Sequence, residues 1–372
     1  MHETREAIMK SYWTRARRLA LRVGLAFAAC AAAAPVLAQN EESSPVVIHG
    51  FLSQALARAW ENPIAGIPQQ TTLDYRAVAV QLAYRTTDTD KLVLQFSHRR
   101  LGASALEAGG NEVDLDWGFY QLGIARGALR VGKMPLPRGL FNEVRDVGTA
   151  LPFYRAPMQV YSDAGETLEG VTFGKRFFAD APWSLHAEAY GGAYDFDYVR
   201  QTPEGPLVET VEARLVHGMQ LWLETPVQGM RFGLGGMRYQ QEGAGDEFFD
   251  TWLASFETIV DRVTLRAEHM YASSLGYSFR AGYAQAGYRV LPDVTINAQA
   301  EYSDVTVQSP FGDMPVEFGR ELVGGITWMV HTNAALKLEA HRFRGYGFDV
   351  MTPFTGPPAL GSFAIASIAV GF

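Results

Sequence analysis

Apolar and polar side chains alternate at every second position along much of this chain. In the clearest segment, 294–303, Val, Ile, Ala, Ala and Tyr alternate with Thr, Asn, Gln, Glu and Ser. Successive side chains of a β-strand leave opposite faces of the sheet, so this period predicts strands with one apolar and one polar face. The same pattern returns at 184–190, 262–268 and 336–341. We therefore expect an all-β fold.

Short breaks that contain proline, glycine or small polar residues interrupt the alternation. Seven of them are typical of tight turns: Thr86–Asp90, Ala125–Gly127, Ala179–Pro182, Pro226–Gly229, Val260–Asp261, Leu291–Asp293 and His331–Asn333. Between successive turns lie pairs of strand-like segments, and a longer, less regular stretch joins the members of each pair. Seven short turns on one rim and eight longer loops on the other predict about sixteen antiparallel strands.

The predicted strands begin with 46–60, 73–85, 91–100 and 111–124, and the last is 363–372. Within 111–124 the alternation changes near Tyr120, which indicates a β-bulge or a shifted register at that point. A register shift of one residue turns every later side chain to the other face, so facing within this segment stays open.

The first 38 residues have the pattern of a secretory signal peptide. A start with six basic residues is followed by an apolar run from Leu19 to Ala34 and by Val36-Leu37-Ala38, a small-residue cleavage signal. The one cysteine of the chain, Cys30, lies inside this leader. A lipoprotein signal at Cys30 is the alternative, but Phe27 stands where a leucine-like residue is usual. We expect a cysteine-free mature chain, 39–372, that forms a single domain.

The composition is rich in apolar residues without concentrating them. Hydrophobic residues make up 48% of the chain, yet the mean hydropathy is −0.05. The mature chain contains no run of 18 or more apolar residues, which a membrane-spanning helix requires. A soluble β-sandwich would also alternate, but the even spacing of the turns gives about 21 residues for each strand with its connection. That length suits tilted membrane-crossing strands of roughly 9 to 11 residues with loops.

A sheet that crosses a membrane must close on itself, because hydrocarbon offers no partner for an exposed backbone N–H or C=O. An eight-stranded barrel fills its interior with side chains, whereas sixteen strands leave a water-filled lumen. The polar face of so many strands therefore predicts a transmembrane antiparallel β-barrel with a pore.

Charge excludes one class of partner. The chain has 32 basic and 40 acidic residues, and the leader carries six of the former and two of the latter. The mature chain keeps 26 basic and 38 acidic side chains, a net charge of about −12. Binding of nucleic acid is not expected from such an acidic chain.

These features together resemble the Gram-negative outer-membrane porins of the sixteen-stranded, usually trimeric kind. The leader, the even strand count, the short turns against long loops and the final strand, which ends in Phe372, carry the resemblance. It implies short periplasmic turns, longer extracellular loops, a homotrimer, and contact with outer-membrane lipid and lipopolysaccharide. It also implies that Phe372 forms part of the signal that the barrel-assembly machinery reads.

The third long connection, 139–166, is the longest in this map. In porins this loop typically folds into the barrel and narrows it, and the resemblance implies the same role here. The acidic Pro-Glu-Phe-Gly-Gly motif of enterobacterial general porins is absent. A solvated surface loop is the alternative. In and beside the loop, both charge signs are offered to a solute by Arg138, Glu143, Arg145, Asp146 and Arg155.

Charged residues on the predicted wall strands complete the candidate constriction, since rings of charge set ion selectivity. An inward charge can also serve only to solvate the lumen. Mixed signs argue against a channel dedicated to phosphate, and the acidic excess favours a weak preference for cations. The wall residues expected to face inward are Arg99, Arg130, Glu188, Arg231, Arg266, Glu268, Arg280, Glu301, Lys337 and Glu339.

The leading hypothesis for function is a passive diffusion channel for small hydrophilic solutes and ions. The alternatives are a substrate-selective channel for a sugar, an organic acid or phosphate, and a barrel with an occluded lumen. An enzyme is not expected, because the chain has no G-x-S-x-G, H-E-x-x-H or Gly-rich phosphate motif. His186 and His341 fall on strands that are not neighbours, so neither a metal nor another cofactor is expected.

Overall fold

The computed structural model describes residues 44–104, 112–161, 165–202, 205–243, 247–274, 276–309, 312–346 and 358–372. The predicted signal peptide, 1–38, lies outside these residues. The chain divides into two units. Ile48–Gly371 forms the β-barrel, and the other unit consists of Met1–Val47 and Phe372. Of this second unit, only 44–47 and 372 are described.

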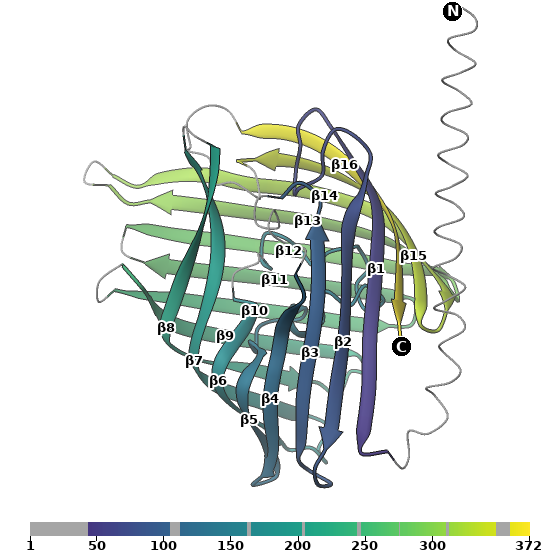
Figure 1. The fold of residues 1–372 in the computed structure, drawn as a ribbon, viewed down its shortest axis with the longest axis vertical. Coiled ribbons are helices and arrows are strands. Elements are labelled where there is room, and N and C mark those ends of the chain that lie inside the picture. Colours follow the sequence, from purple (N-terminus) through teal and green to yellow (C-terminus); the bar gives the residue numbers. More distant parts are fainter. Residues whose placement is uncertain are drawn as a thin grey trace, which may run out of the picture. The chain divides into compact units, whose positions relative to one another are not determined.

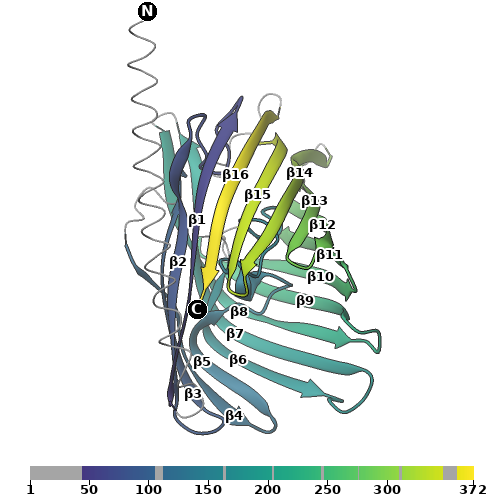
Figure 2. The same cartoon turned by 90° about the vertical axis from the view of Figure 1, so that its right-hand side faces the viewer.

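Sixteen antiparallel strands form one closed barrel, in which each strand pairs with its neighbours in sequence and β1 pairs with β16 (Figures 1 and 2). The closing pair runs in register from Phe51 opposite Gly371 to Trp60 opposite Ser362. The predicted all-β barrel and its strand number are confirmed. The strands are β1 (Val46–Trp60), β2 (Thr72–Arg85), β3 (Lys91–Leu101), β4 (Asp114–Ile124), β5 (Gly127–Pro135), β6 (Thr167–Phe177), β7 (Ser184–Thr202), β8 (Gly205–Glu224), β9 (Met230–Gln241), β10 (Phe248–Val260), β11 (Val263–Ser274), β12 (Tyr277–Leu291), β13 (Val294–Val307), β14 (Met314–His331), β15 (Ala334–Gly345) and β16 (Ala359–Gly371).

The seven predicted tight turns all fall between consecutive strands, from β2–β3 to β14–β15. The expectation of a long loop at every connection on the other rim is wrong at two places. Only residues 203–204 join β7 to β8, and only 275–276 join β11 to β12. At the first of these the extra length is paired instead of looped, because β7 has 19 residues and β8 has 20.

The two faces of the wall differ in the way that the alternation predicts for a barrel in lipid. On β13, Ile296 is 49% exposed, whereas Gln299 is 6% exposed. The same holds on β15, where Leu338 is 60% exposed and Glu339 is 2% exposed. Large apolar side chains thus cover the outside and polar ones are enclosed, which is the reverse of a water-soluble domain.

A β-bulge interrupts the pairing of β3 with β4. Gln95 lies opposite Trp117 and Phe96 lies opposite Leu115, so Asp116 is the extra residue. The bulge therefore lies at Asp116 and not near Tyr120, where the sequence pattern had suggested it. A bulge turns its extra side chain out of the regular alternation. Here Gln95 donates to the Asp116 carboxylate across 3.1 Å.

Two connections narrow the interior. The first, which we call loop 1, is residues 61–71, and its Ile64 and Ile67 pack in one buried cluster with Tyr75 and Phe363. The second, which we call loop 3, is residues 136–166 and is the longest connection. The described residues of loop 3 include one 3-10 turn, η2 (Asn142–Val144). No helix in the described part of the chain has the length and apolar character needed to cross a membrane.

Candidate functional site

Three carboxylates on the inner wall hold the backbone of loop 3. Glu268 of β11 accepts the N–H of Leu140 across 2.9 Å. Glu301 of β13 accepts the N–H of Gln159 across 2.8 Å, and Glu339 of β15 accepts the N–H of Tyr154 across 3.0 Å. These bonds place loop 3 against the inner face of β11, β13 and β15.

Glu268 is the most heavily used of the three anchors. Besides the N–H of Leu140, it accepts the hydroxyls of Tyr161, Tyr283 and Ser255. Burial raises the pKa of the Tyr161 hydroxyl well above its usual value near 10, so this hydroxyl stays protonated and donates. A carboxylate can accept about four hydrogen bonds, and Glu268 uses that capacity on the loop and its surroundings.

The backbone turns into the lumen at Gly139, which has a φ of +59°. A Cβ at this position would lie 2.2 Å from the Tyr161 hydroxyl and 2.6 Å from a carboxylate oxygen of Glu268. Glycine is therefore required here both by the left-handed backbone and by the close approach of the wall.

Two of the predicted loop charges stabilise the loop itself. Arg138 donates to the backbone carbonyl of Val160 across 2.8 Å. Arg145 is buried, with its guanidinium 3.0 Å from the Glu166 carboxylate and 3.2 Å from the carbonyl of Tyr161. Both side chains join the start of loop 3 to its end, so the loop is closed on itself as well as tied to the wall.

Lys337 serves the same purpose from the wall. Its ammonium group donates to the carbonyl of Phe153 across 2.7 Å, and the residue is buried beneath the loop. Thr327 donates to the neighbouring carbonyl of Pro152. The inward facing expected for Lys337 is therefore observed, but the charge is covered by loop backbone.

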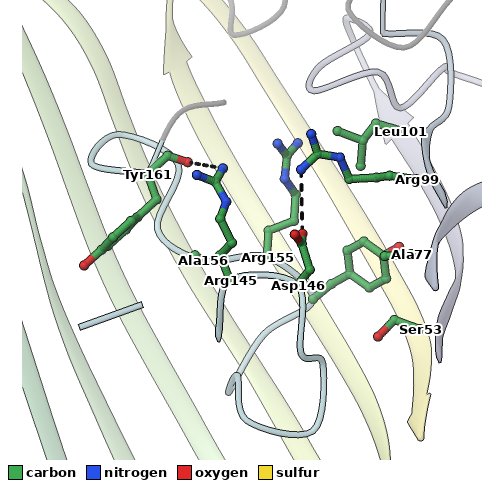
Figure 3. Close-up of a pocket in the computed structure, with 10 residues that line it drawn as sticks. Ser53, Ala77, Arg99, Leu101, Arg145, Asp146, Arg155, Ala156 and Tyr161 are labelled. Atoms are coloured by element: carbon green, nitrogen blue, oxygen red, sulfur yellow. Dashed lines mark hydrogen bonds and ion pairs between the residues drawn. The ribbon is translucent and has the colours of Figure 1, made fainter. Parts of the chain in front are cut away.

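Two cavities that border Arg99 lie on the other side of loop 3, beside β1 to β4. In Figure 3, the Asp146 carboxylate points toward Arg99 of β3, and Arg155 borders the same pocket. The guanidinium of Arg99 lies 3.2 Å from Glu166 and 3.7 Å from Asp146. Arg155 donates to the hydroxyl of Tyr75 across 3.3 Å. Charges of both signs thus meet where the loop faces the β1–β4 wall.

A second cavity of about 90 Å³ adjoins Arg99 on β2, β3 and β4. This volume admits several water molecules. Its charged lining is mainly acidic, since two basic residues face five carboxylates. The lining residues with ionisable side chains are His98, Arg99, Glu112, Asp114, Asp116, Asp146 and Glu166.

A separate ionic group lies between η2 and the wall. Arg130 of β5 is 3.5 Å from Glu188 of β7 and 3.8 Å from Glu143 of η2. Desolvation inside the barrel raises the pKa of Glu143 above the usual value of 4.5 and Glu188 adds to this, whereas Arg130 opposes it and 57% of the side chain remains exposed. Glu143 therefore titrates at a higher pH than an ordinary carboxyl.

The remaining predicted wall arginines divide between the two faces. Arg231 and Arg266 both contact Glu257, at 2.8 and 2.5 Å, and the Arg266 guanidinium lies over the ring of Phe141 in loop 3. Arg280 differs. It lies over the ring of Tyr271, three residues from the enclosed Tyr283 in an unbroken register. The expectation that Arg280 faces inward is wrong, because an odd spacing along a strand reverses the face.

Residues that the sequence reasoning missed occupy much of the site. Glu166 and Glu257 partner predicted arginines, and Asp116 lines the acidic cavity from the bulge of β4. Asp114 and Asp116 stand out in the sequence as two acidic residues in one strand, but the alternation predicts the bulge near Tyr120 and so does not give the facing of Asp116. His341 is held by Glu321, 2.7 Å away, and lies on a strand that does not adjoin that of His186. In the described residues, no cluster of potential metal ligands is present.

No protein-family model and no curated protein matches the chain. Solved structures do match. Salmonella typhi OmpF in complex with daunomycin matches with a TM-score of 0.60 and 10% identity, over 88% of this chain and 97% of that one. The outer membrane channel DcaP of Acinetobacter baumannii matches with a TM-score of 0.56 and 11% identity, over 88% of this chain and 97% of that one. The trimer form of OmpT, an outer membrane protein of Vibrio cholerae, matches with a TM-score of 0.54 and 13% identity, over 88% of this chain and 99% of that one. At these identities the likeness shows a porin-like β-barrel fold.

Proposed function

We propose that the chain is an outer-membrane channel for passive diffusion of small hydrophilic solutes and ions. One observation carries the proposal: a closed sixteen-stranded wall exposes large apolar side chains on its outside and encloses polar ones. Lipid is the environment that suits the apolar outer face, and water is the environment that suits the polar inner face. A water-soluble barrel would have no use for an apolar exterior of this extent.

The location follows from the same reasoning. We propose that 1–38 is a signal peptide removed on export, and that 39–372 inserts as one domain into the outer membrane of a Gram-negative bacterium. Outer-membrane lipid and lipopolysaccharide would surround it, and Phe372 would be read by the barrel-assembly machinery. Barrels of an even strand number are the usual spanning structures of that membrane.

The proposed constriction lies between loop 3 and the wall of β1 to β4. The anchors on β11, β13 and β15 draw the loop to the opposite wall, and the two cavities that border Arg99 lie on this side. Carboxylates outnumber basic groups in the larger cavity. A weak preference for cations is the expected consequence, because lining charge sets ion selectivity.

A substrate-selective channel is the second candidate, and the crowding of the interior favours it. Loop 1 and loop 3 both fill the lumen with buried side chains, and the larger cavity beside the loop measures only about 90 Å³. A narrow passage bordered by fixed charges would discriminate among solutes by size and charge. Saturable flux or block by one solute class, a sugar, an organic acid or phosphate, would mark this function.

We further propose a homotrimer without enzymatic activity. A trimer form of one protein of similar fold supports the assembly. The hydrogen bonds of the inner-wall carboxylates support the lack of enzymatic activity, because Glu268, Glu301 and Glu339 accept N–H groups of the loop backbone. Cross-linking of the refolded protein tests the first, and assays for ester and peptide hydrolysis test the second.

Single-channel recording of refolded 39–372 in a planar bilayer tests the main proposal. Ohmic steps in groups of three with mild cation preference are the expected result. Small steps blocked by one solute would support the selective channel instead. The absence of conductance in every salt and solute tested would overturn both.

A further inference from the structure

Four arginines lie on the outer face of β12, β14 and β15, near the ends of these strands that are remote from the tight turns. We call Arg280, Arg320, Arg342 and Arg344 the arginine cluster. The register shows that they are neighbours: Arg320 lies opposite Arg344, and Arg342 lies opposite the outward Leu322. Figure 2 shows these strands side by side in the part of the wall that leads to β16.

The cluster begins where the apolar belt of the wall ends. On β14, the outward residues Trp328, Ile326 and Leu322 are all exposed, and Arg320 is the next outward residue after Leu322. Ten residues separate the exposed, outward Val330 from Arg320, about 33 Å along the strand and about 25 Å along the membrane normal at a tilt of roughly 40°. The lipid-facing band of an outer-membrane barrel is about 25 Å tall. In the proposed membrane location, the cluster therefore lies level with the headgroups of the outer leaflet.

The cluster has more positive charge than its acidic neighbours can match. Asp304 lies 2.6 Å from Arg320, and Glu317 lies within 4 Å of both Arg320 and Arg344. Within the described ranges, no carboxylate forms an ion pair with Arg280 or Arg342. Glu61 approaches from loop 1, because its carboxylate accepts the hydroxyl of Ser362, which lies opposite Arg342, across 3.3 Å. Three carboxylates thus serve four guanidinium groups. Arg320 and Arg344 also stand directly opposite each other, and like charges in that relation repel.

Two exposed arginines on β8 and β9 are matched by carboxylates. On β8, Arg214 lies between Glu212 and Glu242, with 2.9 Å to the second carboxylate. On β9, Arg238 pairs with Asp250 at 2.7 Å. Each of these exposed arginines has at least one carboxylate to itself. Arg214 and Arg238 therefore provide matched controls.

We propose that the arginine cluster binds the phosphate groups of lipid A, the phosphorylated glycolipid of the outer leaflet. The inference rests on the proposed membrane location. Arginine suits this ligand because its planar guanidinium donates two parallel hydrogen bonds to a phosphate. The exposed Leu322 and Leu360 beside the cluster offer apolar surface to the acyl chains of the same molecule. Phosphate above and hydrocarbon below match the order of groups in that lipid.

The test measures binding of purified diphosphoryl lipid A to the refolded protein in detergent. The variant is Arg342→Gln/Arg344→Gln, and the control is Arg214→Gln/Arg238→Gln. We expect wild type and control to bind equally, and the variant to bind at least tenfold more weakly. Two further lipids serve as probes of wild type: lipid A without its phosphates, and phosphatidylglycerol. Each should bind wild type as weakly as diphosphoryl lipid A binds the variant. Arg342→Lys/Arg344→Lys keeps the charge without the forked donor and should give an intermediate affinity, even if the Gln variant folds poorly.

Equal binding by wild type and the Arg342 and Arg344 variants would overturn the proposal, as would equal binding of lipid A with and without its phosphates. Phosphatidylglycerol that binds as tightly as diphosphoryl lipid A would reduce the cluster to a general anion surface and would also overturn it. Conductance of the same preparations in a bilayer free of lipid A separates the two proposals. If the protein conducts but does not bind lipid A, the proposed channel function stands and the proposed lipid A site fails. If it binds lipid A but does not conduct, the lipid A site stands and the channel function fails.

Discussion

The backbone N–H of Leu140 in loop 3 lies 2.9 Å from a carboxylate oxygen of Glu268 on β11, which also accepts the hydroxyls of Tyr161 and Tyr283. Replacing Glu268 by alanine leaves these buried donors without an acceptor, and each costs about 1–3 kcal/mol. The loop should leave the wall rather than remain unsatisfied. We expect Glu268→Ala to change the unitary conductance and to increase the current noise, as measured by single-channel recording.

Glu268→Gln is the matched control, because the amide keeps a carbonyl oxygen for the N–H of Leu140 while it loses the charge. Its conductance should stay closer to that of wild type. If both variants conducted like wild type with equally quiet currents, Glu268 would not position the constriction.

Arg99 and Asp116 should shift ion preference in opposite directions. Both border the acidic cavity, and Arg99 lies within 4 Å of Asp146 and Glu166. Arg99→Ala removes a positive charge from a lining that keeps its carboxylates, so cation preference should rise, by roughly twofold in permeability ratio. Asp116→Asn should lower it. The reversal potential in a salt gradient measures both effects.

Arg280→Ala is the control for this pair, since Arg280 lies on the outer face over Tyr271. It should leave the reversal potential unchanged in a bilayer of neutral lipid. A shift as large as that of Arg99→Ala would contradict the facing of β12 described above.

The strand number and the turns could be predicted because both depend on local pattern alone. Alternation marks each strand, and proline, glycine and small polar residues mark each turn. The facing of Arg280 failed for a physical reason. Polarity marks the inside only within the lipid band, and beyond Leu322 and Tyr302 the outward positions no longer meet hydrocarbon. An arginine there is as acceptable outside as inside.

The partners of the wall carboxylates could not be predicted from the sequence. Alternation places Glu301 and Glu339 on the inner face. Which loop N–H groups they accept, those of Gln159 and Tyr154, depends on the path of a 31-residue loop through space. Asp116 shows the other limit. One extra residue in a strand changes the facing of its neighbours, and the pattern shows only that such a change occurs nearby.

Glu143 should give the channel a pH dependence above the range of ordinary carboxyls. Desolvation raises its pKa above 4.5, so the folded protein binds a proton at a pH where the unfolded chain does not. The protonated form favours folding, and this contribution is present in full below pH 4.5 and is lost as pH rises through the raised pKa. Cation preference should accordingly fall as pH is lowered through this raised pKa, and Glu143→Gln should remove that part of the change.

Asp90 supplies the comparison for this titration. Its pKa is lowered, chiefly by the hydrogen bond from the N–H of Gly123, so it remains ionised across the same range. Asp90→Asn should leave the pH profile of the reversal potential as in wild type. A profile that Glu143→Gln does not alter would assign the titration to other carboxyls.

Leu338 tests whether the apolar exterior faces lipid. It is 60% exposed in the middle of β15, two outward positions below Arg342. An arginine on a lipid-facing wall costs about 2–4 kcal/mol at the bilayer midplane, whereas on a water-facing wall it costs little. We expect Leu338→Arg to lower the free energy of unfolding in phosphatidylcholine vesicles by that amount, and Leu338→Phe to change it by less than about 1 kcal/mol. Equal stability of the two variants in vesicles would show that this face meets water, and the proposed membrane location would then fail.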